Sequence, residues 1–155
     1  MIRRIPFIIV LILIATNCSN ITKQEFSLTI KHYAGGPGLT VIYYLNDSSL
    51  DVGTNCDLAD CQEKIVYKRT FTKNENDSIY KFINSLQLDT LKSSYKTEGI
   101  MDGLFTNLSF RKGFFRSHSS TFDNFKTPVT DTLFKFIDNL IQMKKYRFYS
   151  WGQDE

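Results

Sequence analysis

Two ten-residue segments decide the fold of this chain: residues 77–86 are DSIYKFINSL and residues 131–140 are DTLFKFIDNL. The segments align without a gap, are identical at five of ten positions, and differ conservatively at the others. In both, apolar residues recur at i, i+3, i+4 and i+7, which is the spacing of an amphipathic helix. Each segment is therefore predicted to be a helix with one buried face, formed by Ile79, Phe82, Ile83 and Leu86 or by Leu133, Phe136, Ile137 and Leu140.

The two predicted helices carry different start signals. Asn74 is the expected N-cap of the first helix, whereas Thr127 followed by Pro128 is the expected start of the second, because proline suits the first helical position. Their similarity has two explanations, a duplicated strand-helix unit or two helices that share a period by chance. In either case the apolar stripes belong to a core and do not form a cofactor site.

Alternating and β-branched segments predict strands around these helices. Residues 26–33 alternate, residues 39–45 are rich in β-branched and aromatic side chains, and the Gly-Gly-Pro-Gly at 35–38 predicts a hairpin turn between them. Residues 64–71 form a third predicted strand. A second hairpin, led by Asp102-Gly103, is expected from the remaining two strands, residues 104–110 and 114–122.

These elements predict an α+β domain. We expect an antiparallel sheet of five or more strands with both helices packed on one face, in the order βββαββα. A short aromatic tail, residues 146–151, could add an edge strand. The length favours one domain, which is assigned to residues 26–155. The residues before it are assigned to an export signal (1–17) and to a modified cysteine with its tether (18–25), for the reasons that follow.

The N-terminus has the three-part layout of an export signal. Met1 to Arg4 is basic, residues 5–15 are an apolar run of eleven, and the chain turns polar after Cys18. A run of eleven is too short to span a bilayer well, since that takes about 20 residues. The alternatives are an uncleaved anchor helix and an ordinary secretory signal.

The residues before Cys18 resemble the relaxed lipobox of spirochaete and Bacteroidetes lipoproteins. The usual lipobox has Leu three residues before the cysteine and Gly or Ala just before it, where this chain has Ala15 and Asn17. The resemblance implies cleavage before Cys18, lipidation of Cys18, including palmitate, and anchoring in the bacterial cell envelope, in the periplasm or at the surface. Secretion is the alternative, and five Asn-x-Ser/Thr sequons would suit it in a eukaryotic host.

Cleavage before Cys18 would remove most of the net positive charge of the chain. The chain carries 19 Lys and Arg against 16 Asp and Glu, and losing Arg3 and Arg4 lowers the net charge from +3 to +1. The remaining sequence has no dense basic stripe, which excludes a nucleic-acid partner.

Cys56 and Cys61 are then an even pair, with four residues between them, in an oxidising compartment. A short disulfide is predicted between them. Neighbouring acidic residues could hold a hard cation, but their spacing fits no EF-hand, so a solvated acidic loop is expected; they are Asp51, Asp57, Asp60 and Glu63. No metal site or cofactor is predicted.

Alternation places one set of polar residues on the sheet face opposite the helices. This face is the candidate binding surface, and its expected members are Lys31, Tyr33, Tyr44, Lys68, Asn107, Arg116 and His118.

Catalytic motifs are absent from the sequence. A Ser-His-Asp arrangement can be assembled only from His118, its neighbouring serines and Asp123, and small polar residues are common on the exposed face of a strand. A non-enzymatic protein or peptide binder is therefore expected, with a small hydrolase as the alternative.

A further resemblance covers residues 26–143. The Gly35-Gly36 turn, the helix at 77–86, Asp102-Gly103 and Pro128 before the last helix resemble emfourin-type inhibitors of thermolysin-like metallopeptidases. The resemblance implies a peptidase as partner and assigns no inhibitory residue. The export signal and the Cys56/Cys61 segment have no counterpart in it.

Overall fold

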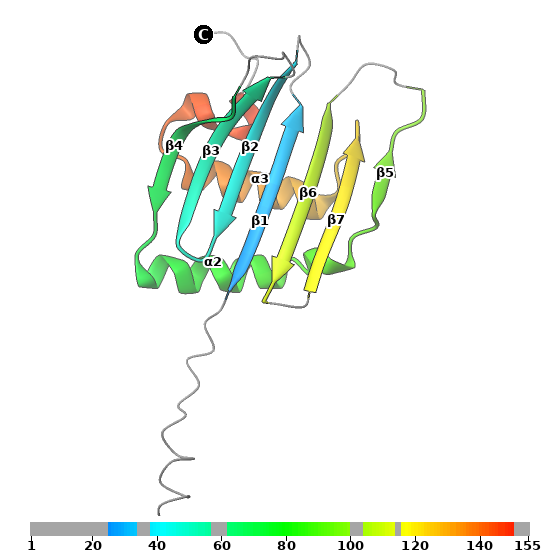
Figure 1. The fold of residues 1–155 in the computed structure, drawn as a ribbon. Helices are drawn as coiled ribbons and strands as arrows, with labels where there is room; N and C mark the ends of the chain where they lie inside the picture. The colour runs from blue at the N-terminus through cyan, green and yellow to red at the C-terminus, as the bar shows by residue number, and fades with distance from the viewer. Residues whose placement is uncertain (1–24, 34–37, 57–61, 100–103, 114–115, 151–155) are drawn as a thin grey trace, which may run out of the picture.

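A sheet of seven strands, backed by two helices, makes up the domain (Figure 1). The computed structural model describes residues 25–33, 38–56, 62–99, 104–113 and 116–150. The predicted export signal, Cys18, Cys61, Asp102-Gly103 and most of the 35–38 turn lie outside these ranges.

The strands run in the order β4-β3-β2-β1-β6-β7-β5 across the sheet. Every neighbouring pair is antiparallel except β5 and β7, which are parallel, so the sheet is mixed. The fold is thus α+β with more than five strands, as predicted. The strands are β1 (Phe26–Tyr33), β2 (Leu39–Asn46), β3 (Ser49–Cys56), β4 (Lys64–Thr70), β5 (Ser94–Lys96), β6 (Phe105–Lys112) and β7 (Arg116–Asp123).

The predicted order βββαββα and the purely antiparallel sheet are wrong, because the sequence prediction missed β3 and β5. β3 contains Asp51, Gly53 and Asn55, residue types that are depleted in strands, and its segment resembles a loop. The turn before it is held by Asn46, whose Oδ1 accepts hydrogen bonds from the amides of Ser48 at 2.8 Å and Ser49 at 2.9 Å. β5 has only three residues, too few for a periodic signal.

The prediction that the aromatic tail adds an edge strand is also wrong for its described residues, 146–150. Residues 144–146 and 148–150 are short 3₁₀-helices. Phe148 is buried and stacks on Phe134 at 4.0 Å between ring centroids, and the Asp138 carboxylate accepts hydrogen bonds from the amides of Phe148 and Tyr149. Burying this ring on the helix side removes the tail from the sheet edge.

Helix α2 (Lys73–Ser85) begins at Thr72 and not at the predicted Asn74. Thr72 and Glu75 form a capping box, in which each side chain bonds the other's backbone amide. Helix α3 (Pro128–Leu140) has Thr127 as its N-cap and Pro128 in its first turn, as predicted. Arg69 joins the two helices, since its guanidinium donates to Glu75 Oε1 at 2.6 Å and to the Leu140 carbonyl at 2.5 Å.

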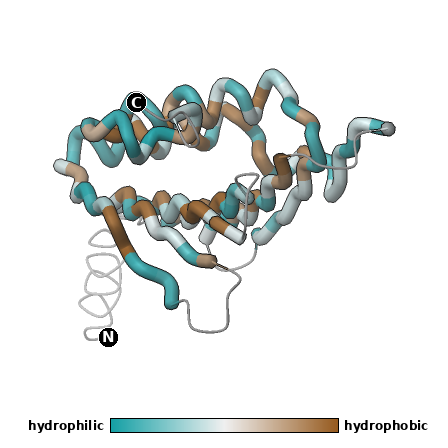
Figure 2. Tube along the Cα trace, turned by 90° about the horizontal axis from the view of Figure 1, so that it is seen from above, coloured by the Kyte–Doolittle hydropathy of each residue, from teal (hydrophilic) through white to brown (hydrophobic). Residues whose placement is uncertain are grey.

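Both helices pack on the same face of the sheet and form a second layer (Figure 2). Ile79, Ile83, Leu133 and Ile137 are at most 3% exposed, and Phe82 stacks on Phe136 at 3.8 Å between the helices. The predicted apolar stripes therefore form the core. Full burial of each such side chain contributes about 1.5–3 kcal/mol, so the contact between helices and sheet contributes substantially to the stability of the fold.

Candidate functional site

The sheet has one covered face and one open face, and strand register assigns each residue to one of them. On β1 the side chains of Phe26, Leu28 and Ile30 are buried toward the helices, so Lys31 and Tyr33 point the other way. Directly paired residues on neighbouring strands share a face. Within the described residues, neither helix covers the face that carries Lys31, which we call the open face (Figure 1).

Five of the seven predicted surface residues lie on the open face. Lys31 pairs with Asn107, Tyr44 with Thr29 of β1, and Lys68 with Asp51, which itself pairs with Tyr44. The structure therefore brings together the set Lys31, Tyr33, Tyr44, Lys68 and Asn107.

Arg116 and His118 lie on the helix side, contrary to the prediction. Arg116 pairs with Lys112 and His118 with Phe110, whose ring is buried in the core. Most side chains of β7 are small and polar, so its alternation is weak. Counting back in twos from the buried Phe122 would have placed His118 correctly.

The same register separates the residues of the Ser-His-Asp arrangement. His118 Nε2 lies 3.0 Å from the hydroxyl of Ser120, which is buried on the helix side. Asp123 lies on the open face, where its carboxylate is 3.8 Å from the Lys96 ammonium. His118 and Asp123 therefore cannot act on one substrate.

Hydroxyl and amide groups cover much of the open face. Two pairs hydrogen bond across β6 and β7, Ser109 with Ser119 at 3.2 Å and Thr121 with Asn107 at 3.0 Å. These groups can donate and accept, so the face suits a polar partner. Register assigns to it Ser27, Thr29, Asn46, Asn107, Ser109, Ser117, Ser119 and Thr121, together with Thr40, which is buried.

Among the strand residues of the open face, four cations stand against two carboxylates, and the Glu63 carboxylate also lies there, on the Tyr44 hydroxyl. Lys68 pairs with Asp51 at 3.4 Å, and Lys96 with Asp123. Lys31 and Arg111 form no ion pair within the part of the chain that the structure describes. The missed residue here is Arg111, which a strand prediction extended to residue 112 would have placed on this face.

The residues of the predicted acidic loop are only partly together. Asp51 belongs to β3, and Glu63 accepts a 2.8 Å hydrogen bond from the Tyr44 hydroxyl. Burial and this carboxylate raise the pKa of Tyr44 to about 12. Asp57, Asp60 and Cys61 lie outside the described residues, so the disulfide with Cys56 stays a prediction. The described residues contain no group of three acidic, His or Cys side chains suited to a metal ion.

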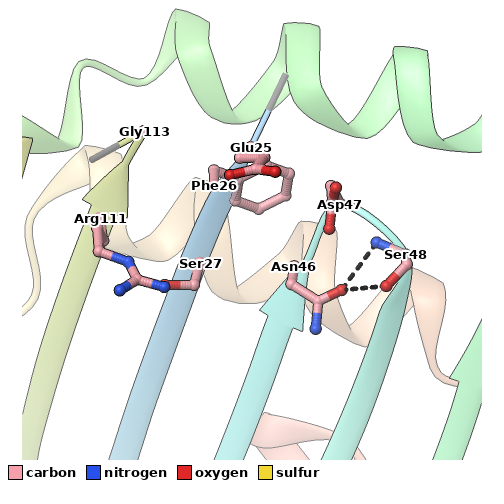
Figure 3. Close-up of a pocket in the computed structure, with 8 residues that line it drawn as sticks. All are labelled: Glu25, Phe26, Ser27, Asn46, Asp47, Ser48, Arg111 and Gly113. Atoms are coloured by element: carbon pink, nitrogen blue, oxygen red, sulfur yellow. Dashed lines mark hydrogen bonds between the residues drawn. The ribbon is translucent and has the colours of Figure 1, made fainter. Parts of the chain in front are cut away.

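A shallow pocket of about 410 Å³ lies where the chain enters the sheet (Figure 3). The Gly113 amide donates to the Glu25 carbonyl at 3.0 Å and fixes the β6 end of the pocket to the start of β1. The Arg111 guanidinium lies beside Ser27, across the pocket from Asp47. The lining is Glu25, Phe26, Ser27, Asn46, Asp47, Ser48, Arg111 and Gly113.

A second cavity, of about 370 Å³, includes His32 at the other end of β1. His32 is 5% exposed, and its Nδ1 lies 3.0 Å from the Thr106 hydroxyl. Desolvation and the nearby positive charge of Lys126 lower the pKa of His32 to about 4, so the ring is neutral at pH 7. Sequence analysis did not find either cavity, since their linings come from segments far apart in the chain.

The chain matches no protein-family model and no curated protein. Neither helix in the described ranges combines the length and apolar composition that crossing a bilayer requires.

The buried His32 predicts a pH dependence of stability. In the unfolded chain its pKa is near 6.5, so between pH 6.5 and 4 the unfolded state takes up a proton that the folded state does not. The free energy of unfolding should therefore decrease by up to about 3 kcal/mol from this group as the pH falls through that window. Urea unfolding at each pH measures it.

His32→Gln should remove this part of the pH dependence, and His118→Gln is the matched control that should retain it. Coincident pH profiles for the wild type and His32→Gln, after subtracting a constant offset, would show that His32 has the same pKa in the folded and the unfolded protein, contrary to this prediction.

Proposed function

We propose that this protein is a lipid-anchored lipoprotein of the bacterial cell envelope that binds a protein partner through the open face of its sheet, without catalysing a reaction. The observation that carries the proposal is the two-sided sheet. One face is closed by α2 and α3, whereas the other presents polar side chains on all seven strands and no covering helix within the described residues.

The anchor would keep this face near a membrane. Seven residues separate Cys18 from Phe26, and an extended tether of that length reaches at most about 25 Å. Glu25 already belongs to the described structure, where its carbonyl accepts the Gly113 amide. A lipidated Cys18 would thus hold the start of β1 and the end of β6 closest to the bilayer.

The open face suits a partner better than the sheet edges do. The β4 edge strand carries Lys64, Lys68 and Arg69 and has a bulge after Val52 of its neighbour β3, features that discourage pairing with another strand. The opposite edge, β5, offers three residues. The central strands of the open face instead present Lys31 and flanking hydroxyl groups on a broad surface.

The charges of this face indicate the chemistry of the partner. Lys31 is exposed at the centre of the sheet, and Arg111 is exposed at the end nearest the predicted tether. A partner with acidic side chains among polar groups would meet both cations and the hydroxyl groups between them. The rings of Tyr33 and Phe105, whose centroids are 5.3 Å apart, supply an apolar contact at the far end of β1 and β6.

The two strand-helix units support the proposed duplication. β4 leads into α2 and β7 into α3, each helix has 13 residues, and a threonine N-cap with a capping box starts each one. The proposed Cys56–Cys61 disulfide would constrain the connection between β3 and β4.

Lipidation of Cys18 is tested by metabolic labelling with a palmitate analogue in a bacterial host. The wild type should carry the label and Cys18→Ala should not, because the thiol is the expected acylation site. Cys56→Ala is the matched control and should keep the label. An unlabelled wild type, or equal label on Cys18→Ala, would reject the anchor.

Lys31→Glu tests the face. The reversed charge should weaken capture of envelope proteins by the full chain about tenfold, since it repels the acidic partner surface that Lys31 attracts. Lys81→Glu is the control, because Lys81 is an exposed residue of α2, and this variant should capture as the wild type does. The amount of captured protein is measured for variants whose thermal stability matches that of the wild type. Equal amounts for Lys31→Glu and the wild type would exclude the open face as the binding surface.

A thermolysin-like peptidase is the first named partner to test, from the resemblance to emfourin-type inhibitors. Undiminished peptidase activity at micromolar excess of the full chain rejects the inhibitor function without affecting the Lys31→Glu comparison.

A further inference from the structure

The 370 Å³ cavity beside His32 lies between the two layers at the end of the sheet away from residue 25. Four segments that are far apart in sequence meet there: the end of β1, the start of β6, the residues after β7, and α3 with the tail. The lining is His32, Leu104, Thr106, Asn124, Phe125, Lys126, Phe134 and Phe148.

Two buried polar groups face this cavity. His32 and Thr106 are each 5% exposed, and the 3.0 Å contact between His32 Nδ1 and the Thr106 hydroxyl uses one nitrogen of the ring. His32 Nε2 has no hydrogen-bond partner within the described residues. The atom is not fully enclosed, so a molecule in the cavity can reach it. Since the ring is neutral at pH 7, Nε2 can donate to or accept from a bound molecule, according to the tautomer.

Aromatic rings form the inner wall of the cavity. The Phe148 ring stacks on Phe134 at 4.0 Å and lies 4.4 Å from the His32 ring. Leu104 and Phe125 are 46% and 40% exposed, so two further apolar side chains border the opening of the cavity. Together these groups form an apolar entrance and an aromatic wall that a flat ring can contact.

Among the described residues of the lining, Lys126 is the one that carries a charge at pH 7. It is exposed, its ammonium lies 4.7 Å from the centroid of the Tyr149 ring, and it is close enough to His32 to affect the titration of that ring. A single cation beside neutral donors balances one negative charge, which favours a carboxylate over a doubly charged phosphate.

We propose that this cavity binds a small aromatic monocarboxylate, with its ring against Phe134 and Phe148 and its carboxylate at Lys126. The volume equals that of about a dozen water molecules in the liquid, so a ligand of about a dozen non-hydrogen atoms fits. This site is separate from the open face, and the proposal does not depend on lipidation or on a protein partner.

The probe is 3-phenylpropionate, titrated into the full chain and followed by ligand-detected NMR. We expect saturable binding with a Kd of about 0.1 mM. The neutral analogue 3-phenylpropanamide should bind about tenfold more weakly, because it lacks the charge that Lys126 attracts.

Two variants locate the bound molecule. Lys126→Gln should reduce the affinity for 3-phenylpropionate to that of the amide and leave amide binding unchanged. Leu104→Trp should block the entrance and abolish binding of both compounds, and because Leu104 is exposed the fold should tolerate the change. Lys135→Gln, on α3 outside the lining, is the matched control and should bind as the wild type does.

Absence of saturable binding at millimolar 3-phenylpropionate would overturn the proposal. Equal affinity of the wild type for the acid and the amide would reject the carboxylate site, as would full affinity in Lys126→Gln. Retained binding in a folded Leu104→Trp variant would move the ligand to another part of the molecule.

Discussion

The packing of two amphipathic helices against one side of the sheet is the interaction on which the rest of the structure depends. Ile83 and Ile137 meet the buried strand residues Leu28, Ile30 and Leu45 in one continuous core. Because strand side chains alternate, closing one face sends every second residue to the other. The Arg69 guanidinium, bound to both helices, and the Asp138 carboxylate, which accepts the tail amides, complete that covered side.

The functional proposals follow from this division of the sheet. The open face collects hydroxyl groups, amides and two cations without ion partners in the described structure, and of the pair His118 and Asp123 it carries only Asp123. Beside His32, the aromatic side chains leave a cavity. The molecule therefore combines a broad polar surface with a cavity beside His32, two separate places to which the proposals assign different classes of partner.

Sequence patterns predicted strongly periodic features well. The helical stripes, the Thr127-Pro128 start and the face of Lys31 required only local spacing. β3 was missed because Gly53 and Asn55 weaken its alternation, and His118 was misplaced because serines flank it on both faces. The cavities depend on contacts such as His32 with Thr106, 74 residues apart, which no local pattern contains.

The proposed function depends most directly on the open face being covered in the proposed location, the cell envelope. Hydroxyl-radical footprinting with mass spectrometry, applied to the full chain both purified and in intact envelopes, measures this through Tyr33 and Phe105 on the open face and Phe125 elsewhere. We expect oxidation of Tyr33 and Phe105 in the purified chain and strong protection in envelopes, with Phe125 equally oxidised in both. Equal oxidation of Tyr33 and Phe105 in the two preparations would contradict a partner on the open face.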